Sequence, residues 1–211
     1  MTEVNQDNVA KQARHGDHKH HHAFTNPAAL AEKWNNPERD KWQYPDEIVA
    51  ALALKPGATV ADLGAGTGYM AAHLSQAVGE GGTVIAIDAE AEMIEYLAKR
   101  QGDLGPATLV PRKVAPNDPD FQTASVDGVL TLDTWHHVEG HEAYASKVYA
   151  GLKSGGRFVV VESDVDAETG PPQAMRLSPM QVTKQLGAAG FRAEIMQESM
   201  PRHYMVVGHK D

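Results

Sequence analysis

A glycine-rich turn is the segment whose residues point most directly to chemistry. It reads Asp62-Leu63-Gly64-Ala65-Gly66-Thr67-Gly68 and follows a short apolar run that predicts a strand. Its glycines let the backbone approach a ligand closely and adopt conformations that a side chain would forbid. Asp88 ends the next apolar run, where a carboxylate can accept hydrogen bonds from both hydroxyls of a ribose. The turn and Asp88 together predict a binding site for a nucleoside cofactor.

The spacing of the glycines and the acid before them indicate which cofactor is bound. A dinucleotide site usually has the spacing Gly-x-Gly-x-x-Gly, with the pyrophosphate at the start of the helix. Here Gly64, Gly66 and Gly68 are spaced Gly-x-Gly-x-Gly. A buried carboxylate at Asp62 would repel a pyrophosphate but suit the ammonium group of an amino-acid moiety. The turn therefore favours S-adenosylmethionine over NAD, and an NAD-dependent oxidoreductase is the weaker alternative.

A second polar cluster, Asp133, His136 and His137, follows the fourth apolar run. Ligands of an open α/β sheet lie beyond the carboxyl ends of the strands, so these side chains are predicted beside the cofactor. If S-adenosylmethionine is bound, the expected reaction is methyl transfer, an in-line displacement that mainly requires a positioned and desolvated nucleophile. Asp133 would face the sulfonium and favour its positive charge. The two histidines are candidate general bases because imidazole titrates near neutral pH; packing or helix capping is the alternative for each.

Five further residues are weaker candidates for contacts with an acceptor. Trp135 is expected to be a wall or core residue rather than a platform on which a substrate stacks. Glu162 and Asp164 follow the fifth apolar run and could reach an acceptor, although we favour solvated loop acids for both. His203 and Tyr204, on the last predicted hairpin, are weaker candidates for contacts with an acceptor.

Alternating strands and helices must position these residues. The predicted strands span 59–63, 83–87, 108–110, 126–132 and 157–161, and the predicted helices between them span 69–78, 90–100 and 141–152. Apolar strands separated by helices indicate a parallel sheet covered on both faces. Two further strands with no helix between them, 191–198 and 204–207, predict a C-terminal hairpin at the edge of the sheet.

Residues 1–44 are expected to form a His-rich segment and a helical lid, and residues 45–211 the cofactor-binding domain. Asn26 and Asn36 each precede a proline, which combines a good helix cap with a residue suited to the first helical position. Such helices could fold over the cofactor and exclude water from the reaction.

Four side chains in this lid deserve separate predictions. Trp34 and Trp42 are expected to anchor the helices on the core. Arg39 and Gln43 are the polar residues of the lid that are candidates for contacts in the site. Arg39 either pairs with a neighbouring acid on an exposed turn or binds a carboxylate of the acceptor or of the cofactor's methionine end.

Five of the chain's 11 histidines crowd into one short stretch, at positions His15, His18, His20, His21 and His22. A solvated tail, part of the lid and a metal site are the three interpretations left open. Structural zinc sites use fixed ligand spacings that this run does not clearly present, so no metal site is predicted.

The amino-acid composition excludes several classes of protein and of binding site. The 211 residues fit one α/β domain with an appendage, and the absence of cysteine excludes disulfides, thiolate metal sites and cysteine nucleophiles. No run approaches the 18 or so apolar residues of a membrane-spanning helix, and no signal peptide is evident. A net charge of −9 argues against binding to nucleic acid. We expect a cytoplasmic protein that acts on a small molecule, of unknown oligomeric state.

Two motifs resemble those of a known family. Val60-Ala61-Asp62-Leu63-Gly64-Ala65-Gly66-Thr67-Gly68-Tyr69 is similar to the first motif of class I S-adenosylmethionine-dependent methyltransferases. Leu152-Lys153-Ser154-Gly155-Gly156-Arg157-Phe158 resembles the turn before their fifth strand. The front of the chain, around Asn36 to Pro45, is similar to a bacterial subgroup without an assigned substrate. The resemblance implies a Rossmann-like α/β fold with a seven-stranded, mainly parallel sheet and an antiparallel C-terminal hairpin.

The resemblance also implies a set of cofactor contacts. The residues it implies are Asp62, Gly64, Ala65, Gly66, Thr67 and Gly68 around the methionine and ribose, Asp88 on the ribose hydroxyls, Ala89, Val114 and Ala115 around the adenine, and Asp133 near the sulfonium. Many members have Asp-Ala where this chain has Val114-Ala115, so Asn117 or Asp118 would have to replace that acid. The implied activity is methylation of an unidentified small molecule. A non-catalytic protein that binds S-adenosylmethionine or S-adenosylhomocysteine is the alternative.

Overall fold

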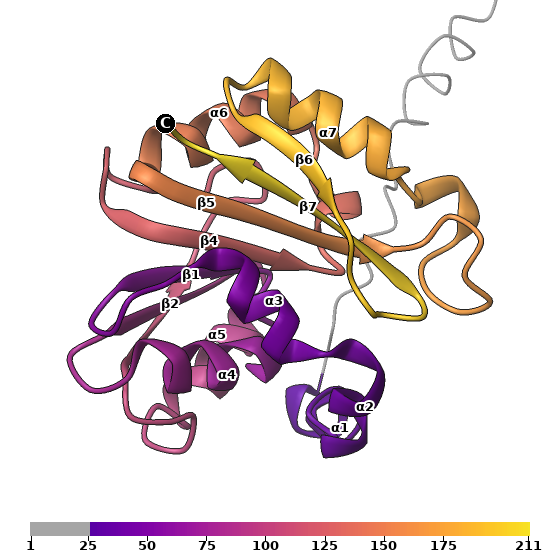
Figure 1. Ribbon diagram of the computed structural model, residues 1–211. Helices are drawn as coiled ribbons and strands as arrows, with labels where there is room; N and C mark the ends of the chain where they lie inside the picture. The colour runs from indigo at the N-terminus through magenta and orange to yellow at the C-terminus, as the bar shows by residue number, and fades with distance from the viewer. Residues whose placement is uncertain (1–25) are drawn as a thin grey trace, which may run out of the picture.

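The computed structural model describes residues 26–211, which fold around one seven-stranded sheet of order β3-β2-β1-β4-β5-β7-β6 (Figure 1). The strands are β1 (Thr59–Leu63), β2 (Thr83–Asp88), β3 (Thr108–Lys113), β4 (Val126–Leu132), β5 (Leu152–Ser163), β6 (Arg192–Met196) and β7 (His203–His209). The first five strands run parallel, whereas β7 is antiparallel to both β5 and β6. The predicted parallel sheet and its C-terminal hairpin are therefore confirmed.

Helices cover both faces of this sheet. They are α1 (Pro27–Trp34), α2 (Asp40–Gln43), α3 (Pro45–Leu52), α4 (Tyr69–Val78), α5 (Ala91–Ala98), α6 (His141–Gly151) and α7 (Pro179–Ala188), with short 3-10 turns η1 (Pro37–Arg39), η2 (Trp135–His137) and η3 (Gln173–Met175). Figure 1 shows α3, α4 and α5 against one face and α6 and α7 against the other. Each face has its own buried apolar cluster, because alternate residues of the central strands point to opposite sides.

Two strands differ in length from their predictions, for local reasons. β5 begins at Leu152, ahead of the predicted start at Arg157, because Leu152 already pairs with Val126 and the following glycine turn is taken up as a bulge in the strand. β3 continues through Pro111, which a central strand would not tolerate. Since β3 lies at the edge of the sheet, the missing N–H of that proline leaves no neighbouring strand unpaired.

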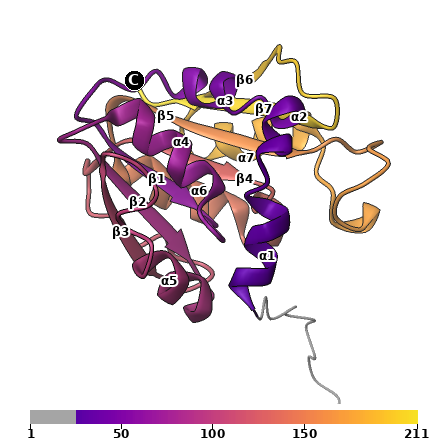
Figure 2. The same ribbon diagram turned by 90° about the horizontal axis from the view of Figure 1, so that it is seen from below.

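The predicted helix starts near the N-terminus are present. The side chain of Asn26 accepts a hydrogen bond from the N–H of Ala29 at 3.2 Å, and that of Asn36 accepts one from Glu38 at 2.9 Å. The second predicted helix is split into η1 and α2. Figures 1 and 2 place α1 and α2 at the edge of the sheet where β1 and β4 end, so this segment adjoins the predicted site.

None of the helices formed by residues 26–211 combines the length and apolar character that crossing a membrane would require.

Candidate active site

The glycine-rich turn connects β1 to α4 in a conformation that needs its glycines. Gly64, Gly66 and Gly68 have φ angles of 76°, 52° and 89°, in the left-handed region. A Cβ atom on Gly64 would lie 2.2 Å from the hydroxyl oxygen of Thr134, so the turn packs directly against the segment that follows β4. The predicted cofactor residues and the predicted catalytic cluster are thereby brought together.

Asp88 shapes this turn from the end of β2. Its carboxylate accepts one hydrogen bond from the N–H of Gly66 and another from that of Glu90, both at 2.9 Å. Burial raises the pKa of the Asp88 carboxyl, although these backbone hydrogen bonds oppose the rise. The carboxylate is thus fixed in direction beside the glycine-rich turn, where it was predicted.

Asp62 lies at the bottom of the same region and is only 2% exposed. One of its carboxylate oxygens, Oδ2, is buried and has no hydrogen-bond partner within residues 26–211. Burial, and secondarily the charge of Asp88, raise the pKa of Asp62 to about 7, and Arg39 opposes this rise. A buried acceptor without a donor is costly, so this atom indicates a site for a hydrogen-bond donor or a cation.

The residues predicted around the adenine line one open groove at the ends of β2 and β3. Its volume is about 680 Å³, and its lining consists of Ala89, Lys113, Val114, Ala115, Pro116, Asp118 and Asp120. Ala89, Val114 and Ala115 are therefore brought together as predicted. Asp118 also lines this groove, where its carboxylate pairs with Lys147 at 2.8 Å.

Asp133 sits just beyond β4, in a strained left-handed conformation with φ of 51°. Its Oδ1 atom accepts hydrogen bonds from Nε2 of His203 at 2.9 Å and from the hydroxyl of Ser163 at 3.2 Å, and its Oδ2 lies 3.7 Å from Nη2 of Arg39. Burial acts to raise the pKa of Asp133, but His203, Arg39 and Ser163 outweigh it and hold that pKa below its usual range. Asp133 is therefore an ionised carboxylate beside the guanidinium of Arg39.

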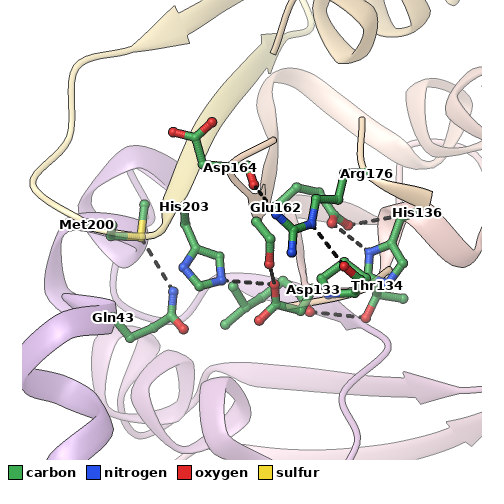
Figure 3. A network of polar contacts seen from close by, with 12 residues as sticks. Gln43, Asp133, Thr134, His136, Glu162, Asp164, Arg176, Met200 and His203 are labelled. Carbon is green, nitrogen blue, oxygen red and sulfur yellow. Dashed lines mark hydrogen bonds and ion pairs between the residues drawn. The ribbon is translucent and has the colours of Figure 1, made fainter. Parts of the chain in front are cut away.

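His136 is held by a second carboxylate (Figure 3). Its Nδ1 lies 2.7 Å from one oxygen of Glu162, and its backbone N–H donates to the other oxygen at 3.1 Å. The two side chains are only 4% and 2% exposed. The expectation that Glu162 is a solvated loop acid was wrong: it lies within the regular part of β5, where its side chain is enclosed and paired with His136. Asp164, beyond the strand end, is exposed as predicted.

The other predicted residues divide between core and surface. Trp135 is fully buried, packs against Phe158 and Tyr144, and donates its indole N–H to Gln185 at 2.9 Å, so it is a core residue. His137 is exposed, with its ring 4.2 Å from that of His136.

Tyr204 is also removed from the site. Its hydroxyl donates to the carbonyl oxygen of Leu177 at 2.8 Å, and burial raises its pKa. This hydroxyl is therefore committed to the chain's own backbone.

Arg39 reaches the site instead of pairing with a neighbouring acid on the surface. Its guanidinium donates to Oε1 of Gln43 from Nε and Nη2 and to the carbonyl oxygen of Trp34, and it lies 4.1 Å from the ring centre of Tyr69. Burial lowers the pKa of Arg39, and the negative charge of Asp133 is the largest of the influences that oppose this decrease. Of the two alternatives left open for Arg39, the surface pairing with Glu38 or Asp40 thus gives way to contacts across the site.

Two contacts of the N-terminal segment were not predicted. Asn35 donates from its amide to the carbonyl oxygen of Thr67 at 2.9 Å, and the Thr67 hydroxyl donates back at 2.6 Å. The ring of Trp34 lies 3.4 Å from where a Cβ of Gly66 would be. Nothing in the sequence marks Asn35 or Ser163, because their partners lie far away along the chain.

The predicted histidine cluster, His15 to His22, lies outside the described residues. Within residues 26–211, no group of His, Asp and Glu side chains is arranged to hold a metal ion.

Known proteins resemble this chain in sequence and in fold. A family model described as a methyltransferase domain matches residues 60–156. An uncharacterized methyltransferase of Mycobacterium tuberculosis (strain ATCC 25618 / H37Rv) is 33% identical over 133 residues, which are 63% of this chain and 51% of that protein. A demethylmenaquinone methyltransferase of Symbiobacterium thermophilum is 28% identical over 125 residues, 59% of this chain and 49% of that protein. The chain thus spans about half the length of these curated relatives.

A solved structure extends the likeness to most of the chain. The crystal structure of a SAM-dependent methyltransferase from Aquifex aeolicus superposes with a TM-score of 0.79 at 25% identity, covering 88% of this chain and 99% of that one. The glycine-rich turn, the strand order and these likenesses agree. The chain therefore contains a methyltransferase domain and is similar in sequence and fold to S-adenosylmethionine-dependent methyltransferases.

Proposed function

We propose that this protein transfers a methyl group from S-adenosylmethionine to a small-molecule acceptor by in-line displacement. The observation that carries the proposal is Oδ2 of Asp62, a buried carboxylate oxygen beside the glycine-rich turn that has no partner among residues 26–211. It fits the ammonium group of the cofactor's methionine moiety, which would supply the missing donor and charge.

The remaining cofactor contacts follow from the same side of the sheet. Asp88 would accept the ribose hydroxyls, and the groove lined by Ala89, Val114 and Ala115 would hold the adenine. The glycines of the turn, with Ala65 and Thr67, would let the backbone lie close to the methionine and ribose. When bound, the cofactor supplies a methyl group on a sulfonium, whose positive charge the nearby carboxylates favour.

On the acceptor side, the proposal assigns roles to Asp133, His136 and His137. Since an ionised carboxylate only accepts hydrogen bonds, the Nδ1 of His136 carries the proton that it shares with Glu162, and Nε2 is left as the proton acceptor. This arrangement favours His136 over the exposed His137 as general base. Asp133 contributes negative charge next to the reacting centre.

The N-terminal segment would close the site against water, as a lid formed within residues 1–44 over the domain of residues 45–211. Asn35 on the glycine-rich turn and Arg39 near Asp133 support this role, because they join the segment to both sides of the site. A small acceptor is the best match to a covered site. The net charge of −9 argues against a nucleic-acid acceptor.

Thermal unfolding with added ligand tests the proposal. S-adenosylmethionine and S-adenosylhomocysteine, each at about 100 times its dissociation constant, should stabilise the protein by roughly 2.7 kcal/mol, a rise in Tm on the order of 5–10 °C. NAD should have no effect. A rise with NAD alone would support an oxidoreductase. Binding of both sulfur nucleosides without methylation of any acceptor in a broad screen would support the non-catalytic alternative.

A further inference from the structure

Two buried polar groups with unused hydrogen-bonding capacity lie where the N-terminal segment covers the start of β7. The side chain of His203 is 5% exposed, and its Nδ1 atom is buried without a partner in the described part of the chain. Gln43 is fully buried, and its amide nitrogen donates to Sδ of Met200 at 3.5 Å. Thioether sulfur is a weak acceptor, so the amide retains donor capacity. Buried polar groups normally have hydrogen-bond partners, so the free capacity of these two side chains needs an explanation.

The hydrogen-bonding character of His203 is determined by Asp133. Because the carboxylate can only accept, Nε2 of His203 carries the proton of their 2.9 Å hydrogen bond. In the neutral ring Nδ1 is then a lone-pair acceptor. Gln43 offers the opposite character: its Oε1 is occupied by Arg39, so the amide presents a donor. One acceptor and one donor therefore face the same region, and in Figure 3 the amide of Gln43 points from α2 toward Met200 and His203.

An aromatic ring and several charged groups lie around this pair. The ring of Trp42 stacks on His203, with centroids 6.0 Å apart and planes inclined by 17°. The nearby charges of Asp133 and Arg39 are paired with each other at 3.7 Å. A hydroxyl can donate to Nδ1 and accept from the Gln43 amide at once.

We propose that His203 and Gln43 form a recognition subsite for a neutral hydroxyl group of the methyl acceptor, with Trp42 as its apolar wall and Asp133 as the positioning residue that fixes the His203 tautomer. The assignment of the hydroxyl to the acceptor rests on the proposed function. Trp42 and Gln43 belong to the N-terminal segment, while Met200 and His203 belong to the C-terminal hairpin. The subsite is therefore formed between these two elements, and the acceptor enters when they separate.

Nitrogen NMR of the full chain labelled with 15N-histidine tests the subsite, with phenol as the probe and toluene as its match without a hydroxyl. The ring-nitrogen resonances of His203 are assigned as those that are missing from the spectrum of His203→Gln. We expect Nε2 to be protonated and Nδ1 unprotonated, and phenol, but not toluene, to shift the Nδ1 resonance. Asp133→Asn should weaken this tautomer preference, which a merely structural role of Asp133 would not predict.

The dissociation constants sharpen the test. His203→Gln keeps a donor for Asp133 but removes the Nδ1 lone pair, so phenol should bind about 5–10-fold more weakly, as expected for one lost hydrogen bond. Toluene affinity should stay unchanged. Equal shifts or equal affinities for phenol and toluene in the wild-type protein would overturn the subsite, as would a protonated Nδ1 with a bare Nε2. This comparison needs no variant to fold.

A separate titration with S-adenosylhomocysteine distinguishes the two proposals. If the nucleoside binds and phenol is not distinguished from toluene, the subsite is wrong and the proposed function stands. If phenol is distinguished and the nucleoside does not bind, the hydroxyl subsite stands and the proposed function fails.

Discussion

The carboxylates on the two sides of the site are held in opposite ways. On the cofactor side, Asp62 and Asp88 have raised pKa values because they are buried without a nearby cation strong enough to compensate. On the acceptor side, Asp133 and Glu162 each share a hydrogen bond with a histidine, at 2.9 and 2.7 Å. The carboxylates on the cofactor side therefore lack a compensating cation among the described residues, whereas those on the acceptor side each have an imidazole partner.

This difference indicates what each side is built to receive. An unpaired buried carboxylate gains most from a cationic ligand, whose charge offsets the cost of burial. A carboxylate that already has an imidazole partner instead fixes the direction of that ring and leaves its far nitrogen for a neutral group. The cofactor side thus suits a ligand with an ammonium group, and the acceptor side suits a neutral acceptor.

Breaking the pair on the acceptor side should give the largest effect. His136→Ala leaves the carboxylate of Glu162 buried with no imidazole, which should lower the free energy of unfolding by about 3–5 kcal/mol. Urea denaturation at pH 7 measures this loss. Lys184→Ala, at an exposed position of α7, serves as the control and should change stability by less than about 0.5 kcal/mol. Equal effects of the two substitutions would show that the buried pair makes no particular contribution to the free energy of unfolding.

On the cofactor side, Asp88→Ala should weaken binding of S-adenosylhomocysteine by about 100-fold. The substitution removes the acceptor for the ribose hydroxyls and also frees the N–H of Gly66 that positions the turn. Isothermal titration calorimetry measures the change. Asp103→Ala, an exposed acid outside the site, is the matched control. Unchanged affinity in Asp88→Ala would refute the ribose role of this residue.

The arrangement of the proposed cofactor side could be predicted from the sequence because its signal is local. The glycine spacing, Asp62 and Asp88 all lie within one strand-turn-helix-strand unit, and such a unit imposes its geometry wherever it occurs. The same holds for the sheet, since strand periodicity and the terminal hairpin are local patterns.

The acceptor side was predicted less well because its contacts join distant parts of the chain. Glu162 and His136 pair across adjacent strand ends, and His203 returns to Asp133 from the last hairpin. Spacing along the sequence carries no record of such pairs. Glu162 was misjudged for this reason, since an acid near a strand end is usually solvated unless the fold supplies a partner.

A smaller effect is expected from Asp62→Asn, with opposite signs for binding and stability. Removing the charge should weaken binding of S-adenosylhomocysteine about tenfold at pH 8, by loss of the partner for the ammonium group. The ligand-free variant should nevertheless be more stable than wild type at that pH, by about 1–2 kcal/mol, because ionised Asp62 is buried and incompletely paired.

The pH dependence follows from the raised pKa of Asp62. A carboxyl whose pKa rises on folding, here from 3.8 to about 7, contributes stability at low pH that is lost as the pH rises through that window. The advantage of Asp62→Asn should therefore be small at pH 4 and full at pH 8, as measured by urea denaturation of the ligand-free proteins. A constant difference across this range would show that Asp62 does not titrate there.

The smallest effect is expected where the N-terminal segment meets the cofactor side. Thr67→Val keeps the shape of the side chain but removes the hydroxyl that donates to Asn35, and leaves the hydrogen bond from Asn35 to the Thr67 carbonyl oxygen. Loss of one partly buried hydrogen bond should cost about 0.5–1.5 kcal/mol locally, so amide exchange over residues 26–44 should become a few-fold faster. Hydrogen–deuterium exchange with mass spectrometry measures this directly. Thr183→Val removes a comparable hydroxyl from α7, away from the site, and should leave that exchange unchanged. If exchange accelerates over 26–44 and bound S-adenosylhomocysteine restores it, the segment closes on the cofactor side; if the two variants behave alike, its attachment depends on Arg39 and the acceptor side instead.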